Sequence, residues 1–256
     1  METSADVVVP DRRLGKLPPK FDSRTLRLAR YIEKRKLPKI PASHVLSKKT
    51  LKAFPALGMM RNDALSDCTC AAMAHSFQTW TAYGGQPWVP SDTQIVALYN
   101  KVNHGVDKGA NMLDVLNKVR EEGIGGNKIY AFVAIDTTDH DQVRTAHFLF
   151  GGLYFGAGLP VTAQAQEGEG KVWELLPGAN GSEPYSWGGH AMNLVDTGKK
   201  TLKAVTWGHL QALTWEWWDR YVDECFAILE EDYVGADKRS PQGFSLKKLA
   251  ADLVGL

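Results

Sequence analysis

A cysteine at the start of a helix is the first candidate for chemistry in this sequence. Cys68 follows the polar run 61–66 and begins the segment 67–83, whose small residues and later aromatic residues predict a buried helix. The positive end of a helix favours a thiolate, the reactive form of cysteine, and a neighbouring imidazolium does the same. The residue types therefore predict a nucleophile that needs a histidine from a distant segment.

His190 is a candidate for that partner because it begins the apolar run 190–195 after two glycines. Glycines such as Gly189 leave room for another backbone to approach closely. Composition alone does not select His190 from the seven histidines. His75 lies seven residues after Cys68, on nearly the same helical face, and we expect it to be a core histidine with satisfied hydrogen bonds.

The other two cysteines have simpler interpretations. Cys70 lies two residues after Cys68 and would point about 200° away on the helix, so both thiols cannot face one histidine. Cys70 is either an alternative nucleophile or a core residue. Two thiols without a Cys-x-x-Cys or a histidine pair make a poor zinc site, so no metal and no cofactor are expected. Cys225 lies in an apolar run and is expected to be structural.

The elements that must position these residues change in character along the chain. Helices are predicted first and short apolar strands later, which indicates an α+β fold with a helical lobe and a sheet lobe. The predicted helices cover 67–83, 91–102, 112–122, 141–150 and 215–221. The predicted strands cover 129–135, 152–161, 190–195, 202–207 and 225–229.

The chain divides into an N-terminal extension (1–56), a main domain (57–232) and a tail (233–256) with a short amphipathic helix. The extension has one predicted helix, 23–36, in which Leu26, Tyr31 and Ile32 are expected to be buried. Residues 12–49 hold thirteen Lys or Arg and two acids, which leaves the rest with 17 basic and 27 acidic residues. We expect this basic arm to lie along the acidic body. It could also contact nucleic acid, but it lacks the motifs that read bases.

The overall composition excludes several classes of protein. A hydrophobic content of 44% and a net charge of +1 are typical of a soluble globular protein. No apolar stretch approaches the ~18 residues that a membrane span needs. The N-terminus has no basic, then apolar, signal pattern, and three cysteines do not make a disulfide framework. A cytoplasmic protein with reduced thiols and no membrane partner is expected.

Several motifs, in order, resemble the papain-like cysteine peptidase family, as a divergent bacterial or phage-type member. The run 62–69 resembles the segment in which an amide side chain precedes the nucleophile by six positions, and 189–195 resembles the strand with the catalytic histidine. The run 205–208 resembles the Asn-Ser-Trp-Gly segment. Two further runs, 90–96 and 151–156, resemble the entry to the second helix and the Gly-Pro-Val strand. The order matches over roughly residues 57–232.

This resemblance implies a two-lobed fold and a thiol hydrolase of peptide or amide bonds. It implies that Cys68 is the nucleophile, that His190 is the base and acid, and that Asn62 replaces the usual glutamine as oxyanion donor. It also implies that Trp207 shields the pair from water. The remaining residues expected to bind substrate are Gly189, Trp187 and Gly105, although Gly105, like Gly109, is explained equally well as a loop residue.

The main departure from the family lies at Val205, where the family has the asparagine that orients the histidine. A backbone carbonyl, Thr206, Asn193 or a carboxylate could take over that role, and catalysis is expected to be weak or unusual. Two other functions stay open: a non-catalytic binding or structural protein on the same scaffold, and a transferase that passes an acyl group to an amine. For a hydrolase, the expected partner is a peptide or protein substrate.

Overall fold

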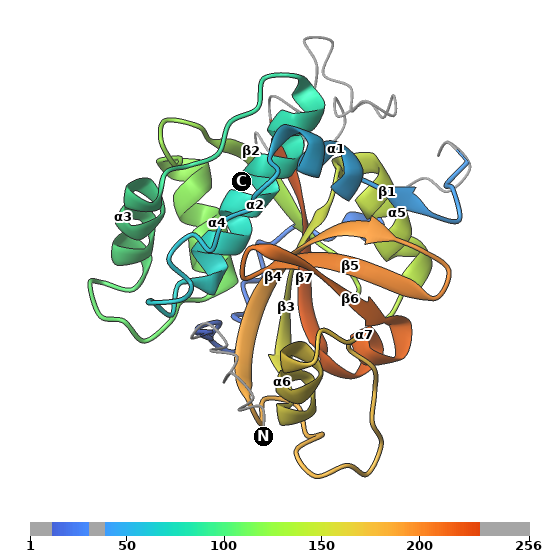
Figure 1. The fold of residues 1–256 in the computed structure, drawn as a ribbon. Helices are drawn as coiled ribbons and strands as arrows, with labels where there is room; N and C mark the ends of the chain where they lie inside the picture. Colours follow the sequence, from blue (N-terminus) through green and yellow to red (C-terminus); the bar gives the residue numbers. More distant parts are fainter. Residues whose placement is uncertain (1–11, 31–38, 231–256) are drawn as a thin grey trace, which may run out of the picture.

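The computed structural model describes residues 12–30 and 39–230, and these form one sheet with helices packed around it (Figure 1). Elements before the sheet's main strands are η1 (Leu28–Arg30), β1 (His44–Val45), α1 (Ser47–Ala53), α2 (Cys68–Gly84), α3 (Asp92–Val102) and α4 (Met112–Glu121). Those that follow are β2 (Ile129–Ala134), α5 (His140–Phe150), β3 (Leu153–Leu159), α6 (Val161–Gly168), β4 (Gly188–Thr197), β5 (Thr201–Thr206), β6 (His209–Thr214), α7 (Trp215–Tyr221) and β7 (Val222–Glu230).

The strands of the described residues make a seven-stranded antiparallel sheet in the order β2-β7-β3-β4-β5-β6, with β1 on β4. Strand β3 pairs with both β4 and β7, and all seven of its residues are buried. In the register, Ala157 lies opposite His190, so the glycine-rich centre of β3 supports the strand that carries the histidine. The central strands of the sheet therefore position His190.

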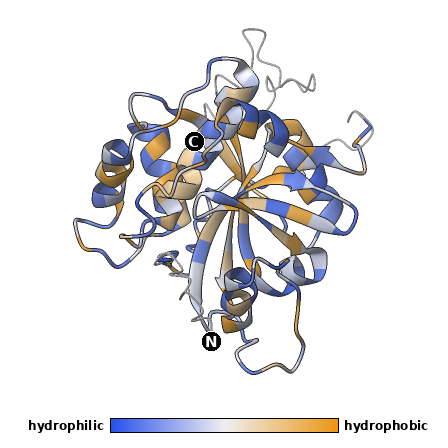
Figure 2. Ribbon diagram, viewed as in Figure 1, coloured by the Kyte–Doolittle hydropathy of each residue, from blue (hydrophilic) through white to orange (hydrophobic). Residues whose placement is uncertain are grey.

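Helix α2 is the main element of the helical lobe and packs against the sheet (Figure 1). Fifteen of its seventeen residues, from Cys68 to Ala82, are buried, and Gly85 ends it in the left-handed conformation. A helix that is buried on all sides lies in the interior, and Figure 2 shows apolar colour in parts of α2 and in the strands beside it. Helix α3 follows with a capping box between Ser91 and Gln94.

The predicted α+β fold is confirmed, and the boundaries of the elements in the main domain agree closely. Helix α7 covers 215–221 as predicted, and α2, α3, α4 and α5 begin or end within a residue or two of the predicted limits. Strand β6 and helices α1 and α6 were not predicted. Each is short, and its sequence shows no clear apolar period. Its burial depends on neighbouring elements of the fold, which a local pattern does not reveal.

The predicted helix 23–36 is wrong in its described part. Residues 23–27 form turns and one bridge, and only Leu28–Arg30 make a single 3₁₀ turn. The reason is that the backbone of this segment serves the sheet edge: Ala134 N–H donates to the Leu26 carbonyl, and Arg27 bridges to Ala134. Leu26 is half-buried, while Tyr31 and Ile32 lie outside the described residues.

The N-terminal extension is partly built into the main domain. Strand β1 pairs with the end of β4, and the Asp196 carboxylate accepts hydrogen bonds from the backbone N–H groups of Leu46 and Ser47. Helix α1 then packs on α2. The tail 233–256 lies outside the described residues. Among the described helices, none combines the length and the apolar character needed to cross a membrane.

Candidate active site

Cys68 is the first residue of α2, so its thiol belongs to the helix N-terminus, where four backbone N–H groups lack an intrahelical partner. The backbone of Ala191, the residue after His190, and the backbone of Gly15 both lie close enough to the thiol to lower its pKa, against the effect of burial. The side chain is 1% exposed. The structure thus brings the predicted nucleophile to the strand that carries the predicted base.

The imidazole of His190 is held from two sides. Its Nε2 lies 2.7 Å from the Thr206 hydroxyl, and its ring stacks on the Trp207 indole with 4.1 Å between centroids and 19° between planes. Within the described part of the chain, Nδ1 has no hydrogen-bond partner. One nitrogen is therefore anchored while the other remains open to exchange a proton with a reacting group.

Thr206, and not Val205, contacts the histidine. Neighbouring residues of a strand point to opposite faces, and Val205 packs on the far side in a small apolar cluster with Leu46, Leu57 and Val195. Of the substitutes considered from the sequence, Asn193 donates instead to the His75 carbonyl and the Thr79 hydroxyl. The hydroxyl of Thr206 is therefore the group that orients the ring.

Asn62 is buried in the loop before α2, and its side-chain amide donates to the Leu65 carbonyl at 3.1 Å. Its own backbone carbonyl accepts from Arg13 N–H at 3.1 Å. The amide is thus engaged within its loop in this conformation. Its predicted role as oxyanion donor stays a prediction.

The feature that the sequence did not predict is a covering segment, residues 12–17, which crosses the site. The backbone N–H groups of Gly15 and Lys16 both donate to the Gly189 carbonyl, at 3.1 and 3.0 Å. Trp207 Nε1 donates to the Arg13 carbonyl, and Lys16 forms a parallel bridge with Ala110. The segment therefore contacts both lobes of the predicted site, and it covers Cys68 and His190, neither of which is exposed.

Close approach is what allows the segment to lie there. A Cβ on Gly15 would stand 1.9 Å from the Ser66 carbonyl oxygen, and one on Gly189 would stand 2.1 Å from the Lys16 carbonyl oxygen. The Arg12 guanidinium adds a contact 5.3 Å from the centre of the Trp207 ring and an ion pair with Glu167. The one sequence signal for this arrangement was the glycine before His190, which was expected to permit a close backbone.

The covered pair is electrically neutral. Burial raises the pKa of the Cys68 thiol to about 12, and the charge of Asp67 acts in the same direction. Burial also lowers the pKa of His190 to about 3, with a further decrease from the charge of Arg12. A thiolate–imidazolium pair needs the opposite order of pKa values. Because burial is the largest cause for both groups, exposing them would bring the two values toward each other.

Asp67, the residue before the nucleophile, is a further buried group at the site. Burial raises the pKa of its carboxyl to about 8. Hydrogen bonding from the Asn62 side chain and from the backbone N–H of Asp67 partly opposes this rise in pKa. A protonated, neutral Asp67 beside α2 would spare the thiolate a like-charge neighbour at neutral pH.

The other residues singled out from the sequence divide between the site and the core. The Trp187 ring lies 5.5 Å from that of Trp207, at the edge of the site. Gly105 lies in a loop where an added Cβ would meet nothing, whereas a Cβ on Gly109 would stand 2.1 Å from the Gly15 carbonyl oxygen. Of the two glycines weighed for this role, Gly109 is therefore the one that contacts the covering segment.

The remaining cysteines and His75 are buried in the core. His75 hydrogen-bonds Gln78 through Nδ1, as expected for a satisfied core histidine. Cys70 and Cys225 are buried, and burial raises the pKa of both thiols. Both belong to hydrophobic core clusters, which is the structural role expected for Cys225 and one of the two roles considered for Cys70.

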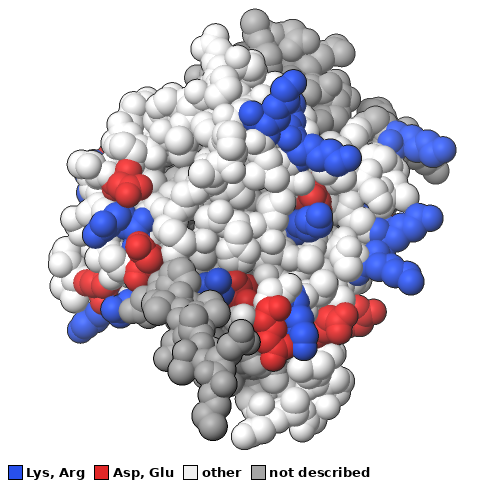
Figure 3. Space-filling view, in the orientation of Figure 1, with Lys and Arg blue, Asp and Glu red and all other residues white. Residues whose placement is uncertain are grey.

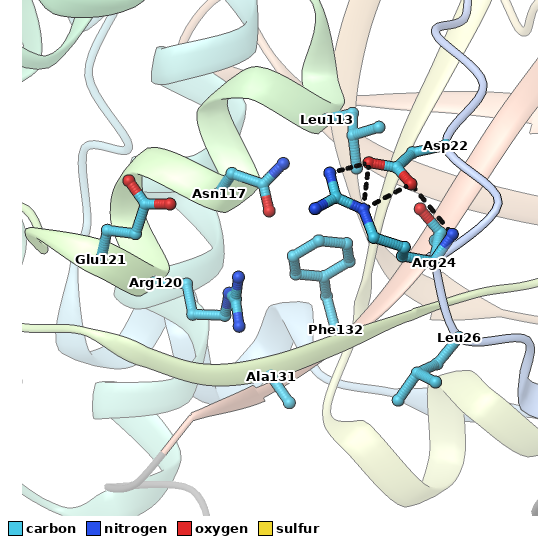
Figure 4. A pocket seen from close by; sticks show the side chains of 10 residues that line it. Asp22, Arg24, Leu26, Leu113, Asn117, Arg120, Glu121, Ala131 and Phe132 are labelled. Carbon is cyan, nitrogen blue, oxygen red and sulfur yellow. Dashed lines mark hydrogen bonds and ion pairs between the residues drawn. The ribbon is translucent and has the colours of Figure 1, made fainter. Parts of the chain in front are cut away.

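A separate hollow lies between the N-terminal segment, α4 and β2 (Figure 4). The Asp22–Arg24 ion pair closes one side of it, and Asn117, Arg120 and Glu121 project from α4 toward it. It contains neither a thiol nor a histidine, so it offers no nucleophile.

On the face shown in Figure 3, acidic and basic side chains stand beside one another over much of the lower half.

Comparisons with known proteins agree with this geometry. No family model and no curated protein matches this sequence. Solved structures do match: xylellain, a cysteine protease from Xylella fastidiosa, is 16% identical with a TM-score of 0.66, over 86% of this chain and 97% of that one. The procathepsin B S9 of Trypanosoma congolense is 14% identical with a TM-score of 0.62, over 86% and 87%.

A third match is the Carica candamarcensis cysteine protease CMS1MS2, solved in complex with E-64. It is 11% identical with a TM-score of 0.54, over 75% of this chain and 99% of that one. The chain thus has the fold of the papain-like cysteine proteases, at low identity to each of them, and the resemblance seen in the motifs is confirmed at the level of the fold.

Proposed function

We propose that this protein is a papain-like thiol hydrolase that cleaves peptide or amide bonds and whose site is closed in the conformation described. The observation that carries the proposal is the arrangement around His190. Thr206 holds Nε2, Trp207 holds the ring plane, and Cys68 heads a helix beside the same strand. A merely structural histidine has no need of an open second nitrogen in this place.

The chemistry follows from the two side chains. His190 removes the proton from the Cys68 thiol, and the sulfur attacks the carbonyl carbon of the substrate. The developing oxyanion is stabilised by the backbone N–H of Cys68 and by Asn62 once its loop turns the amide toward the site. His190 then gives its proton to the leaving amine. Water, activated by His190, attacks the thioester and releases the acid and the free thiol.

The covering segment must leave before this can occur. Its departure would admit water to both groups and would remove the Arg12 charge from the neighbourhood of His190. Both changes favour the ion pair, because water stabilises the thiolate and the imidazolium alike. The same motion would free the backbone hydrogen-bonding groups of Gly189 and Ala110, so that a peptide substrate could bind them.

The test uses the full chain with Gly15→Ala, in which the new Cβ meets the Ser66 carbonyl and displaces the segment. We expect this variant to cleave an unfolded protein substrate at neutral pH, and Gly15→Ala combined with Cys68→Ala to be inactive. Gly168→Ala is the matched control, since its Cβ would meet nothing. Added hydroxylamine, with product analysis, separates hydrolysis from transfer to an amine.

A Gly15→Ala variant whose Cys68 reacts with iodoacetamide but which cleaves nothing would overturn the hydrolase proposal. That outcome would favour the non-catalytic binding protein or, if the amine is acylated, the transferase.

A further inference from the structure

The side chain of Lys16 lies in a pocket beside the site. It is fully buried, and its ammonium contacts Asp223 at 3.0 Å, Glu224 at 3.1 Å and the Tyr185 hydroxyl at 3.1 Å. The Leu17 carbonyl accepts a fourth contact at 3.3 Å. A buried ammonium needs partners for its three donors, and these oxygens supply them, so together they define a cation site.

The walls of the pocket are shaped for an unbranched stem. A Cβ on Gly156 would stand 2.0 Å from Lys16 Cε, so the methylenes run directly over the backbone of β3. The sulfur of Met112 lies next to them, and the Tyr185 ring packs 5.5 Å from the ammonium. The shape fits a linear side chain with a charged end and leaves no room for branching near the strand.

The charge of the pocket belongs to the main domain. Asp223 and Glu224 both come from β7, and the Glu224 carboxyl is buried. Burial raises the pKa of Glu224, and the ammonium of Lys16 partly opposes that effect. Burial likewise disfavours the charge of Lys16, but Glu224 and Asp223 outweigh it, and the pKa of Lys16 lies above its usual value. Without a cation, two carboxylates would face each other in a half-closed space.

The position of the pocket ties it to the reaction. Lys16 directly follows Gly15, whose backbone contacts the Cys68 sulfur, and both residues bond the Gly189 carbonyl next to His190. The covering segment thus presents a short extended peptide to the site, with glycine at the thiol and lysine in the acidic pocket. A substrate peptide that replaces the segment would find the same pocket one residue from the thiol.

We propose that the pocket formed by Asp223, Glu224 and Tyr185 is a specificity subsite for a lysine side chain, adjacent to the residue that the thiol attacks. The inference rests on the proposed function of the Cys68–His190 site, and Lys16 is its internal occupant. The compact ammonium is preferred to guanidinium, because the carboxylates close around a group at the length of a lysine stem.

The experiment uses the full chain carrying Gly15→Ala and Lys16→Ala, so that the pocket is empty. Rates of cleavage are compared for two internally quenched peptides, Leu-Gly-Lys-Leu and Leu-Gly-norleucine-Leu, which keep the order of residues 14–17 and differ in the charge of one side chain. We expect kcat/KM to favour the lysine peptide by ~10-fold or more. Glu224→Gln should remove most of this preference. Glu183→Gln, which removes a carboxylate that is 77% exposed, should preserve it.

A second measurement does not depend on thiol chemistry. Calorimetry measures binding of the amidated peptide Leu-Gly-Lys-Leu, a copy of residues 14–17, to the same protein with Cys68→Ala. Binding that is lost with norleucine or with Glu224→Gln supports the subsite even if no amide is cleaved. Equal rates and equal binding for lysine and norleucine would overturn it, and so would the absence of binding by either peptide. Cleavage of both peptides at equal rates would support the hydrolase proposal and contradict the lysine subsite.

Discussion

The two halves of the site differ in how closely each resembles a state that could react. On the sheet side, His190 has a hydrogen-bond partner, a stacked indole and an open nitrogen. On the helix side, burial keeps Cys68 in the protonated form, and the backbone of the covering segment contacts its sulfur. The proposed base is thus positioned within the folded domain, whereas the proposed nucleophile would become available if residues 12–17 moved away. On this proposal, the sheet sets the orientation of the histidine and the covering segment sets the reactivity of the cysteine.

Displacing the segment should have the largest effect. Gly15→Ala is expected to raise the rate at which iodoacetamide labels Cys68 by on the order of 100-fold or more at pH 8, because the pKa of the thiol would move from about 12 toward its ordinary value. Mass spectrometry of the labelled peptide measures the rate, and Gly168→Ala is the control. Equal rates in the two variants would show that the segment does not limit access.

The pH dependence sharpens the same contrast. In the wild type, labelling of Cys68 is expected to increase about tenfold per pH unit from pH 7 to pH 10, because the covered thiol loses its proton only near pH 12. The variant Gly15→Ala should instead level off near the pKa of the exposed thiol. If the labelling rate of the wild type did not change with pH above pH 7, Cys68 would already be a thiolate under the segment. That result would contradict the conclusion that the covered thiol is protonated.

On the histidine side, the sensitive residue is Thr206. Replacing it with valine keeps the shape and removes the hydroxyl from Nε2, so turnover in the Gly15→Ala background should fall on the order of 10-fold. Thr206→Ser keeps the hydroxyl and should retain most of the activity. If Thr206→Val were as active as the serine variant, stacking on Trp207 would be sufficient to orient the ring.

Val205 should affect stability rather than rate. Val205→Asn places an amide in the apolar cluster with Leu46, Leu57 and Val195, and an unpaired buried polar group costs roughly 1–3 kcal/mol. Urea unfolding is expected to show this decrease in the free energy of unfolding, with no gain in turnover. The family motif suggests the opposite result, in which asparagine restores an orienting residue. A rise in activity would show that the strand can present residue 205 to His190.

The sequence by itself determined the order of helices and strands, the helix that begins at Cys68 and the short helix 215–221. These depend on local signals such as capping residues, glycine stops and apolar periods, which a single segment carries. The resemblance of five short motifs then identified His190 and Trp207. The structure stacks the rings of these two residues on each other.

Three features were decided by the tertiary structure alone. Thr206 is chosen from the substitutes considered for Val205 because the register of β5 sets which of two neighbouring residues faces His190, and a motif cannot show this. The segment 12–17 crosses the site through pairings with Gly189 and Ala110, which lie far away in sequence. The pocket for Lys16 joins it to Asp223 and Glu224, more than 200 positions later. Contacts between such distant residues leave no local pattern, so only the folded chain reveals them.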